Sequence, residues 1–141
     1  MTIEKLYPEK VFYYFNEISK IPRGSKKEKQ ISNWLLDFAK KKKLEVIQDD
    51  FLNIFIKKKA TPGYEEYSPL IIQGHMDMVW EKNKETEFDF ETQGIELIIE
   101  DGFLKAKGTT LGADNGLAVA YALAILDSDD IKHTAPEIII T

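Results

Sequence analysis

The stretch Pro-Leu-Ile-Ile-Gln-Gly-His-Met-Asp, residues 69–77, decides how the fold of this chain is interpreted. Its first five residues form a compact apolar run, which predicts a strand buried on both faces of a sheet. Glu137 to Thr141, with three consecutive isoleucines, shows the same pattern. The two runs predict a sheet whose strands lie inside the protein.

The segments around these runs predict helices and further strands. Ser25 and Glu28 have the spacing of a capping box at the start of a helix, and Asp101-Gly102 is a strong hairpin signal. We expect helices at residues 8–19, 25–42 and 113–127, and strands at residues 44–48, 53–58, 95–100 and 103–107. Helices combined with buried strands and a hairpin predict an α/β fold with a mixed sheet.

The composition is that of a globular domain. Of the 141 residues, 43% are hydrophobic and 30% are charged, so the chain can bury a sizeable core. No apolar run reaches the roughly 18–20 residues of a membrane span, and the N-terminus lacks the apolar region of a signal peptide. Cysteine is absent, which excludes disulfides and thiolate metal ligands. We expect a cytoplasmic protein that does not bind membranes.

The net charge of −5 is unevenly distributed along the chain. Residues 1–59 hold 14 Lys and Arg against 8 Asp and Glu, whereas residues 60–141 hold 5 against 16. The basic half could indicate nucleic-acid binding. Its lysines stand in short runs at predicted element ends, which favours a solvated surface and no nucleic-acid partner. The carboxylates of the acidic half could hold a metal ion.

The first candidate site is His75 and Asp77, directly after the strand at residues 69–73. Residues i and i+2 of an extended chain face the same side, so both would project from the carboxyl end of the strand, where open α/β sheets place their sites. An imidazole is a good zinc ligand, and the carboxylate could either bind the metal or orient the ring. The alternative is a hydrogen-bonded pair in a loop.

The second candidate is Gly-Thr-Thr-Leu-Gly-Ala-Asp-Asn-Gly, residues 108–116, at the start of a predicted helix. Here the glycines could let the backbone approach closely while Asp114 points at a cation. Alternatively, Asp114 is a helix N-cap followed by a turn. A phosphate-binding loop is disfavoured, because the P-loop lysine is missing and Asp114 would repel phosphate.

Together, residues 74–83 (GHMDMVWEKN) and 108–120 (GTTLGADNGLAVA) resemble the M20 metallopeptidase family. More narrowly, they resemble its aminoacyl-histidine (Xaa-His) dipeptidase branch. Residues 10–41 are similar to the N-terminal helices of that family, so the resemblance covers essentially the whole chain. It implies a three-layer α/β sandwich with a mixed, mainly parallel sheet that is incomplete at its C-terminus. Trp80, just after His75 and Asp77, could be either a core residue or a pocket wall.

The resemblance also implies a chemistry. Two metal ions, usually zinc, with manganese or cobalt as alternatives, would activate water for the hydrolysis of Xaa-His dipeptides. His75 would bind one ion, Asp114 would bridge both, and Asp77 would be the supporting catalytic acid that holds the His75 ring. Residues 1–141 would be the N-terminal portion of the catalytic domain. Complete relatives are expected to be homodimers.

Other parts of the family pattern would lie beyond Thr141. These are a Glu-Glu pair that supplies the general base and one ligand, a further Asp and His ligand, and a lid domain. We therefore expect the 141 residues alone to be inactive. The alternative is a non-catalytic remnant or protein-interaction domain with a partial metal site. A magnesium-dependent phosphate enzyme ranks third.

Overall fold

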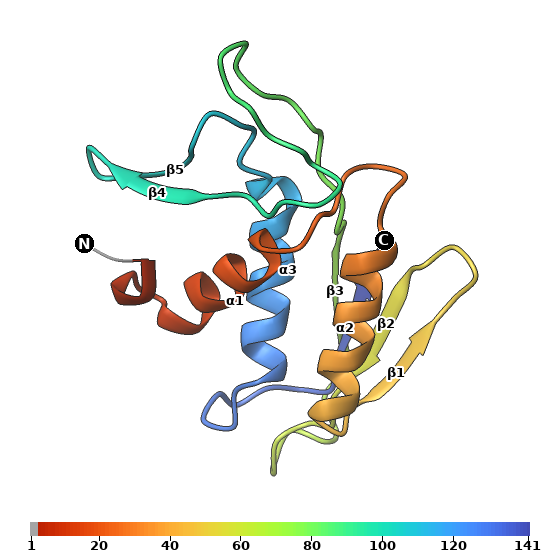
Figure 1. Cartoon of the computed structure of the whole chain (residues 1–141). Coiled ribbons are helices and arrows are strands. Elements are labelled where there is room, and N and C mark those ends of the chain that lie inside the picture. The colour runs from red at the N-terminus through yellow and green to blue at the C-terminus, as the bar shows by residue number, and fades with distance from the viewer. Residues whose placement is uncertain (1–2) are drawn as a thin grey trace.

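The computed structural model describes residues 3–141 and shows an α/β fold in which three helices pack against a four-stranded sheet (Figure 1). The elements in chain order are η1 (Ile3–Lys5), α1 (Glu9–Ser19), α2 (Lys29–Lys41), β1 (Glu45–Gln48), β2 (Ile54–Lys57), β3 (Leu70–Gly74), β4 (Leu97–Glu100), β5 (Phe103–Ala106), α3 (Ala113–Leu126) and β6 (Pro136–Ile140). None of the helices in this described range is long and apolar enough to cross a membrane.

The predicted helices are present, but α2 begins later than its expected capping box. The helix begins at Lys29, and its N-cap residue Glu28 makes no side-chain capping bond. Instead, Glu28 accepts a hydrogen bond from the Lys26 amide at 2.6 Å. The Ser25 hydroxyl donates to the Asp77 carboxylate and is therefore not available to cap the helix. The capping box was a wrong prediction because a tertiary contact uses its serine.

The sheet has the order β1-β2-β6-β3 and is mixed, as predicted. In the described residues only the pairing of β3 with β6 is parallel, so the sheet is not mainly parallel. The short link at residues 49–53 joins β1 and β2 as an antiparallel hairpin. The parallel pair β3 and β6 instead needs the long connection that includes α3.

A separate hairpin, β4–β5, turns at Asp101 and Gly102, which both have positive φ, as the sequence predicts.

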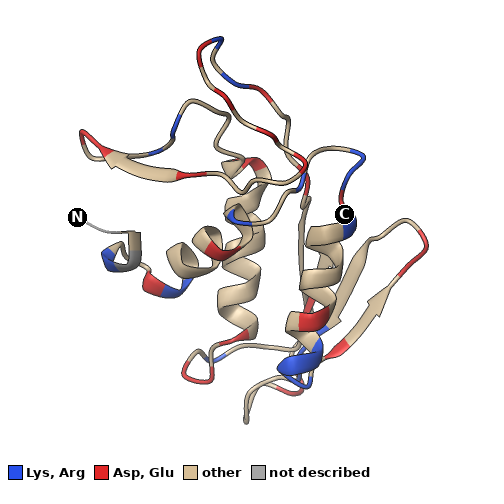
Figure 2. Ribbon diagram, in the orientation of Figure 1, with Lys and Arg blue, Asp and Glu red and all other residues tan. Residues whose placement is uncertain are grey.

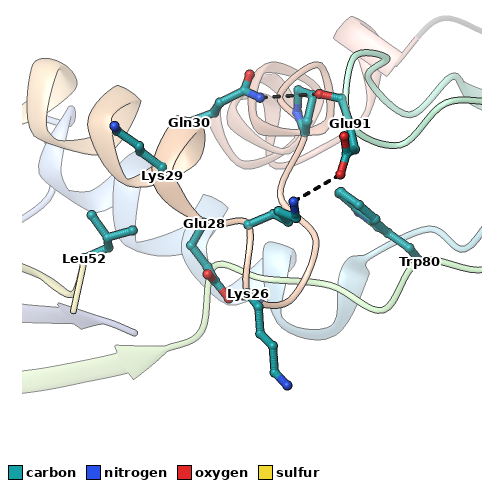
Figure 3. A pocket seen from close by; sticks show the side chains of 9 residues that line it. Lys26, Glu28, Lys29, Gln30, Leu52, Trp80 and Glu91 are labelled. Atoms are coloured by element: carbon teal, nitrogen blue, oxygen red, sulfur yellow. Dashed lines mark hydrogen bonds and ion pairs between the residues drawn. The ribbon is translucent and has the colours of Figure 1, made fainter.

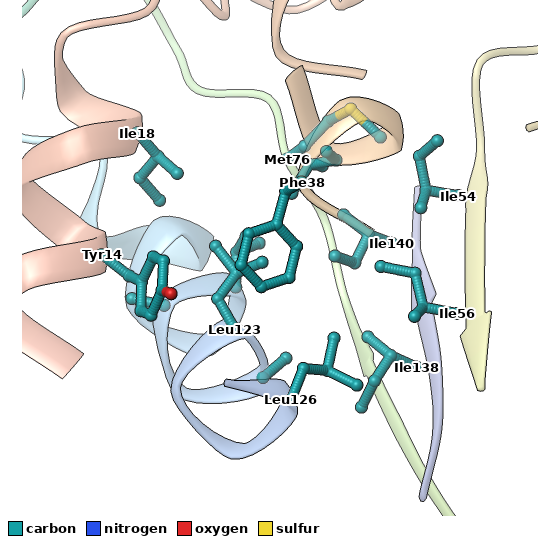
Figure 4. Close-up of a cluster of buried hydrophobic side chains, with 14 of the residues drawn as sticks. Tyr14, Ile18, Phe38, Ile54, Ile56, Met76, Leu123, Leu126, Ile138 and Ile140 are labelled. Atoms are coloured by element: carbon teal, nitrogen blue, oxygen red, sulfur yellow. The ribbon is translucent and has the colours of Figure 1, made fainter. Parts of the chain in front are cut away.

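One face of the sheet is covered by the helices. Ile54 and Ile56 of β2 and Ile138 and Ile140 of β6 are at most 1% exposed. They pack into one core with Leu123 and with other side chains from all three helices (Figure 4). Full burial of such a side chain stabilises the fold by about 1.5–3 kcal/mol.

The other face has no helical layer among residues 3–141. Phe55 alternates with Ile54 and Ile56 along β2 and is 36% exposed, and Ile47 of β1 is 59% exposed. On β3, Ile71 is 59% exposed, so the prediction that this strand is buried on both faces is wrong. The described residues thus form two layers, and the third layer that the resemblance implies is not found among residues 3–141.

Candidate metal centre

The chain leaves β3 in an extended form that separates polar from apolar side chains. The Met76 amide donates to the carbonyl of Thr141 at 2.8 Å, so the pairing with β6 continues past the end of the strand. Met76 and Met78 are 1% and 2% exposed, whereas His75 and Asp77 are only partly buried. The predicted alternation is therefore present, and His75 and Asp77 lie on the same side.

The His75 ring is held by Asp77 from one of its two nitrogens. Nδ1 lies 3.0 Å from Asp77 Oδ1 and 3.1 Å from the Asp77 carbonyl oxygen. A carbonyl oxygen can only accept a hydrogen bond, so we assign the proton to Nδ1. This assignment leaves Nε2 free to act as an acceptor or a ligand.

Asp114 lies on the other side of the same ring. Its Oδ1 is 3.2 Å from His75 Nε2, although the two residues are 39 positions apart in the chain. Asp114 is the second residue of α3, its backbone is not helical (φ −88°, ψ 105°), and the N-cap position belongs to Gly112. Its side chain makes no capping hydrogen bond and is 92% exposed. The geometry therefore favours the metal interpretation of Asp114 over the N-cap interpretation.

The pair formed by Nε2 and Asp114 Oδ1 fits a metal ion. With the proton on Nδ1, both atoms are electron-pair donors, and they can face each other closely only if a cation lies between them. That cation is either a second proton on the ring or a metal ion. Two ligands of one tetrahedral zinc ion, each about 2.0–2.1 Å from the metal, are about 3.3–3.4 Å apart. The observed 3.2 Å is close to this separation.

The chain supplies only part of such a site. Within residues 3–141 no group of three or more His, Cys, Asp or Glu side chains is arranged to hold an ion together. Asp77 lies on the Nδ1 side of the ring, away from Asp114, and so it orients His75 instead of completing the ligand set. His75 and Asp114 are thus two candidate ligands of an ion that needs further ligands.

The glycines of residues 108–116 have a different role from the one that we expected. A Cβ on Gly108 would overlap the Thr86 hydroxyl, and a Cβ on Gly112 or Gly116 would lie 2.6 or 2.7 Å from Nη2 of Arg23. These glycines therefore leave room for protein side chains.

Sequence reasoning missed Arg23 and Ser25 as residues that contact the site. The only signal for them was their place in the break Ile-Pro-Arg-Gly-Ser at residues 21–25.

A cavity of about 390 Å³ lies beside the loop that precedes α2 (Figure 3). Trp80 forms one wall of this cavity and stacks on Phe90, with ring centroids 5.4 Å apart. A Cβ on Gly24 would overlap the Trp80 indole, so the ring also packs against the backbone. Across the cavity, Lys27 pairs with Glu91 at 3.1 Å. Trp80 is therefore both packed and part of a pocket wall.

The lysine runs of the basic half gather near the C-terminal end of α2 (Figure 2). Lys42 forms an ion pair with Asp127, and Lys57 pairs with Glu137 at 2.9 Å. Acidic residues from the second half of the chain thus offset part of this positive charge.

Comparison with known proteins first defines the class of fold. No family model matches the chain. A tripeptidase from Staphylococcus aureus superposes on 94% of it with a TM-score of 0.73, at 21% identity and over 36% of its own length. Aminopeptidase PepT from Bacillus cereus superposes over the same shares with a TM-score of 0.69 at 26% identity. The fold is that of a peptidase domain.

Two dipeptidases are more similar still. Aminoacylhistidine dipeptidase from Vibrio alginolyticus covers the entire chain with a TM-score of 0.97 and 40% identity. The cytosol non-specific dipeptidase of Escherichia coli is 39% identical over 139 residues. The chain is homologous to these dipeptidases, which confirms the resemblance seen in the two motifs. It spans 29% of the length of each.

Proposed function

We propose that this chain is the N-terminal portion of the catalytic domain of a metal-dependent dipeptidase. The observation that carries the proposal is the close approach of His75 Nε2 to Asp114 Oδ1, with Asp77 on the opposite ring nitrogen. Two segments far apart in the sequence are brought together to present electron-pair donors to one point. The homology to two dipeptidases supports a peptide as the substrate.

The residues of this chain would each have a separate task. His75 and Asp114 would bind divalent cations, and Asp114 would be shared between two of them. Asp77 would keep the Nδ1 proton in place and so fix the ring orientation that presents Nε2. When bound, such cations would polarise the peptide carbonyl and lower the pKa of the attacking water. Zinc suits this nitrogen and oxygen donor set, as do manganese and cobalt.

The remaining parts of the reaction are proposed to come from sequence beyond Thr141. A glutamate general base contributes about 10²–10⁴-fold to such a rate, and the missing ligands would complete the metal site. We propose dipeptides with a C-terminal histidine as substrates, in line with the name of the Vibrio homologue. We propose the cytoplasm as the location, in line with the name of the Escherichia coli homologue. A homodimer is proposed for the complete protein.

The first test is the gene sequence after the codon for Thr141. The proposal expects an open reading frame with Glu-Glu within about ten residues, a distance set by ordinary loop lengths. A stop codon directly after Thr141 would contradict the catalytic proposal. It would leave the non-catalytic alternative, for which the exposed apolar face with Ile47, Phe55 and Ile71 would be a contact surface.

The second test is Asp114→Asn in the complete protein. We expect the zinc stoichiometry to fall and dipeptide hydrolysis to drop by at least about 100-fold, the upper end of what an outer-shell partner alone contributes. Asp101→Asn, in the exposed β4–β5 turn, is the matched control and should leave both unchanged. Unchanged zinc content and rate in Asp114→Asn would overturn the assignment of Asp114 as a ligand.

A further inference from the structure

A fully buried arginine lies directly behind the candidate metal centre. Arg23 is 1% exposed and comes from the loop between α1 and α2. Burial lowers the pKa of Arg23 to about 10, against the opposing effect of the Asp77 charge, so the guanidinium stays protonated at neutral pH. Burying a charge is costly unless hydrogen bonds compensate it, and the partners of Arg23 therefore indicate its role.

The two terminal nitrogens of Arg23 bond to two different segments of the site. Nη1 donates to the Met76 carbonyl at 3.1 Å, and Nη2 donates to the Gly112 carbonyl at 2.7 Å. Met76 stands between His75 and Asp77, while Gly112 stands two residues before Asp114. A single side chain thus connects the segments that carry all three candidate site residues.

The helix that follows Asp114 is shaped to receive this guanidinium. A Cβ on Gly116 would lie 2.7 Å from Nη2 and 3.2 Å from Cζ of Arg23. Gly116 lies in α3, where alanine has a higher helix propensity than glycine. The close approach of Arg23 is a physical reason for glycine at this position.

The backbone on either side of Arg23 joins the same segment. The Met78 amide donates to the Arg23 carbonyl at 2.9 Å, and the Ser25 amide donates to the Met78 carbonyl at 3.2 Å. The Ser25 hydroxyl donates to Asp77. Residues 23–25 therefore lie alongside residues 76–78 and reach the site from behind.

We propose that Arg23 is a positioning residue that sets the separation between His75 and Asp114 and thereby the affinity of the site for a divalent cation. A guanidinium has no free electron pair and cannot itself be a ligand. Its hydrogen bonds to carbonyls are charge-assisted and roughly twice as strong as neutral ones. This inference rests on the proposed function, because it concerns the same metal site.

The test measures Co²⁺ binding to the complete protein by titration, with the visible absorption spectrum as a report of ligand geometry. Arg23→Met is expected to weaken binding by about 10–100-fold, as for other residues that orient metal ligands, and to change the spectrum. Arg23→Lys keeps the charge but cannot span both carbonyls, so it should restore only part of the affinity. Lys27→Met, which removes a cation that is 60% exposed from the same loop, is the control.

Gly116→Ala provides an independent variant in case Arg23→Met does not fold. It adds a methyl group against the guanidinium while raising helix propensity, so the helix should persist as Co²⁺ affinity falls. Folded Arg23→Met or Gly116→Ala protein with wild-type affinity and spectrum would overturn the inference.

A second readout separates this inference from the proposed function. In metal-free protein, the ¹⁵N resonances of the His75 ring should shift in Arg23→Met and Gly116→Ala but not in Lys27→Met. Wild-type protein that binds no Co²⁺ would contradict the proposed function. The ring resonances would still test the role of Arg23. Unchanged His75 resonances in both Arg23→Met and Gly116→Ala would refute the proposal that Arg23 is a positioning residue.

Discussion

The two faces of the sheet differ sharply, although they are built from alternate residues of the same strands. On the covered face, Ile54 and Ile56 are fully buried beneath the helices. On the open face, Phe55 is 36% and Ile71 is 59% exposed. His75 and Asp77 follow Ile71 at intervals of two and so continue the alternation of the open face, whereas Asp114 reaches His75 from α3, one of the helices on the covered face. The covered face supplies most of the stability, and the open face carries His75, Asp77 and uncovered apolar surface.

The largest expected effect compares two neighbours on β2. Ile56→Ala should lower the free energy of unfolding by about 2–5 kcal/mol, because it leaves a cavity in the core. Phe55→Ala should cost less, about 1–2 kcal/mol, because Phe55 is 36% exposed and its removal leaves no enclosed cavity. Urea denaturation of both variants measures the difference. Equal losses would mean that the open face is covered in solution and that the contrast between the faces is wrong.

The next effect concerns the polar end of the open face. Asp77→Asn in the complete protein should lower metal affinity by about 10–100-fold, because the carboxylate that orients His75 is lost. Calorimetric titration with Zn²⁺ gives the affinity. Ser25→Ala removes only the hydroxyl that donates to Asp77 and should have a smaller effect of the same sign. A larger effect for Ser25→Ala than for Asp77→Asn would contradict this order.

A third, smaller effect tests whether charge also holds the helical layer. Burial would raise the pKa of Asp127, but hydrogen bonds from Lys42 and Tyr14 outweigh burial and lower it. The stabilisation is therefore present above the unfolded pKa of about 3.9 and is lost as the pH falls through the lower folded value. Asp127→Asn should be less stable than wild type at pH 7, by about 1 kcal/mol or less for a partly exposed pair.

The measurement is thermal unfolding of both proteins from pH 7 down to pH 2. The difference between wild type and Asp127→Asn should shrink as the pH falls below about 4, because the carboxylate is protonated first in the unfolded chain and then, at its lowered pKa, in the folded protein. A difference that stays constant over this range would show that packing, and not charge, accounts for the effect of the substitution.

The smallest effect on stability is expected on the open part of β3. Ile71→Lys should change the free energy of unfolding by less than about 0.5 kcal/mol and should reduce self-association of the 141-residue chain, because exposed apolar patches promote contacts. Phe103→Lys, at a 67% exposed site on β5, is the control. Sedimentation velocity compares the variants. Equal reductions in both would show that the open face has no special role.

Local patterns predicted much of the fold and part of the candidate site. The hairpin at Asp101-Gly102 formed as expected, because positive φ at both turn residues is a local requirement. His75 and Asp77 share a side because alternation is intrinsic to extended backbone. By contrast, the capping box at Ser25 failed, since its hydroxyl bonds to Asp77, which lies 52 residues away. Local sequence reasoning cannot weigh a competitor of that kind.

The sequence alone determined which residue types are available and which face of each strand they occupy. Periodicity and turn chemistry act over a few residues, and so they can be recognised without knowing the fold. Only the tertiary structure decided that His75 lies 3.2 Å from Asp114, that Arg23 joins their two segments, and that Ile71 is exposed. These features depend on strand order, register and the packing of α3, which bring distant segments together and are not encoded in any short stretch.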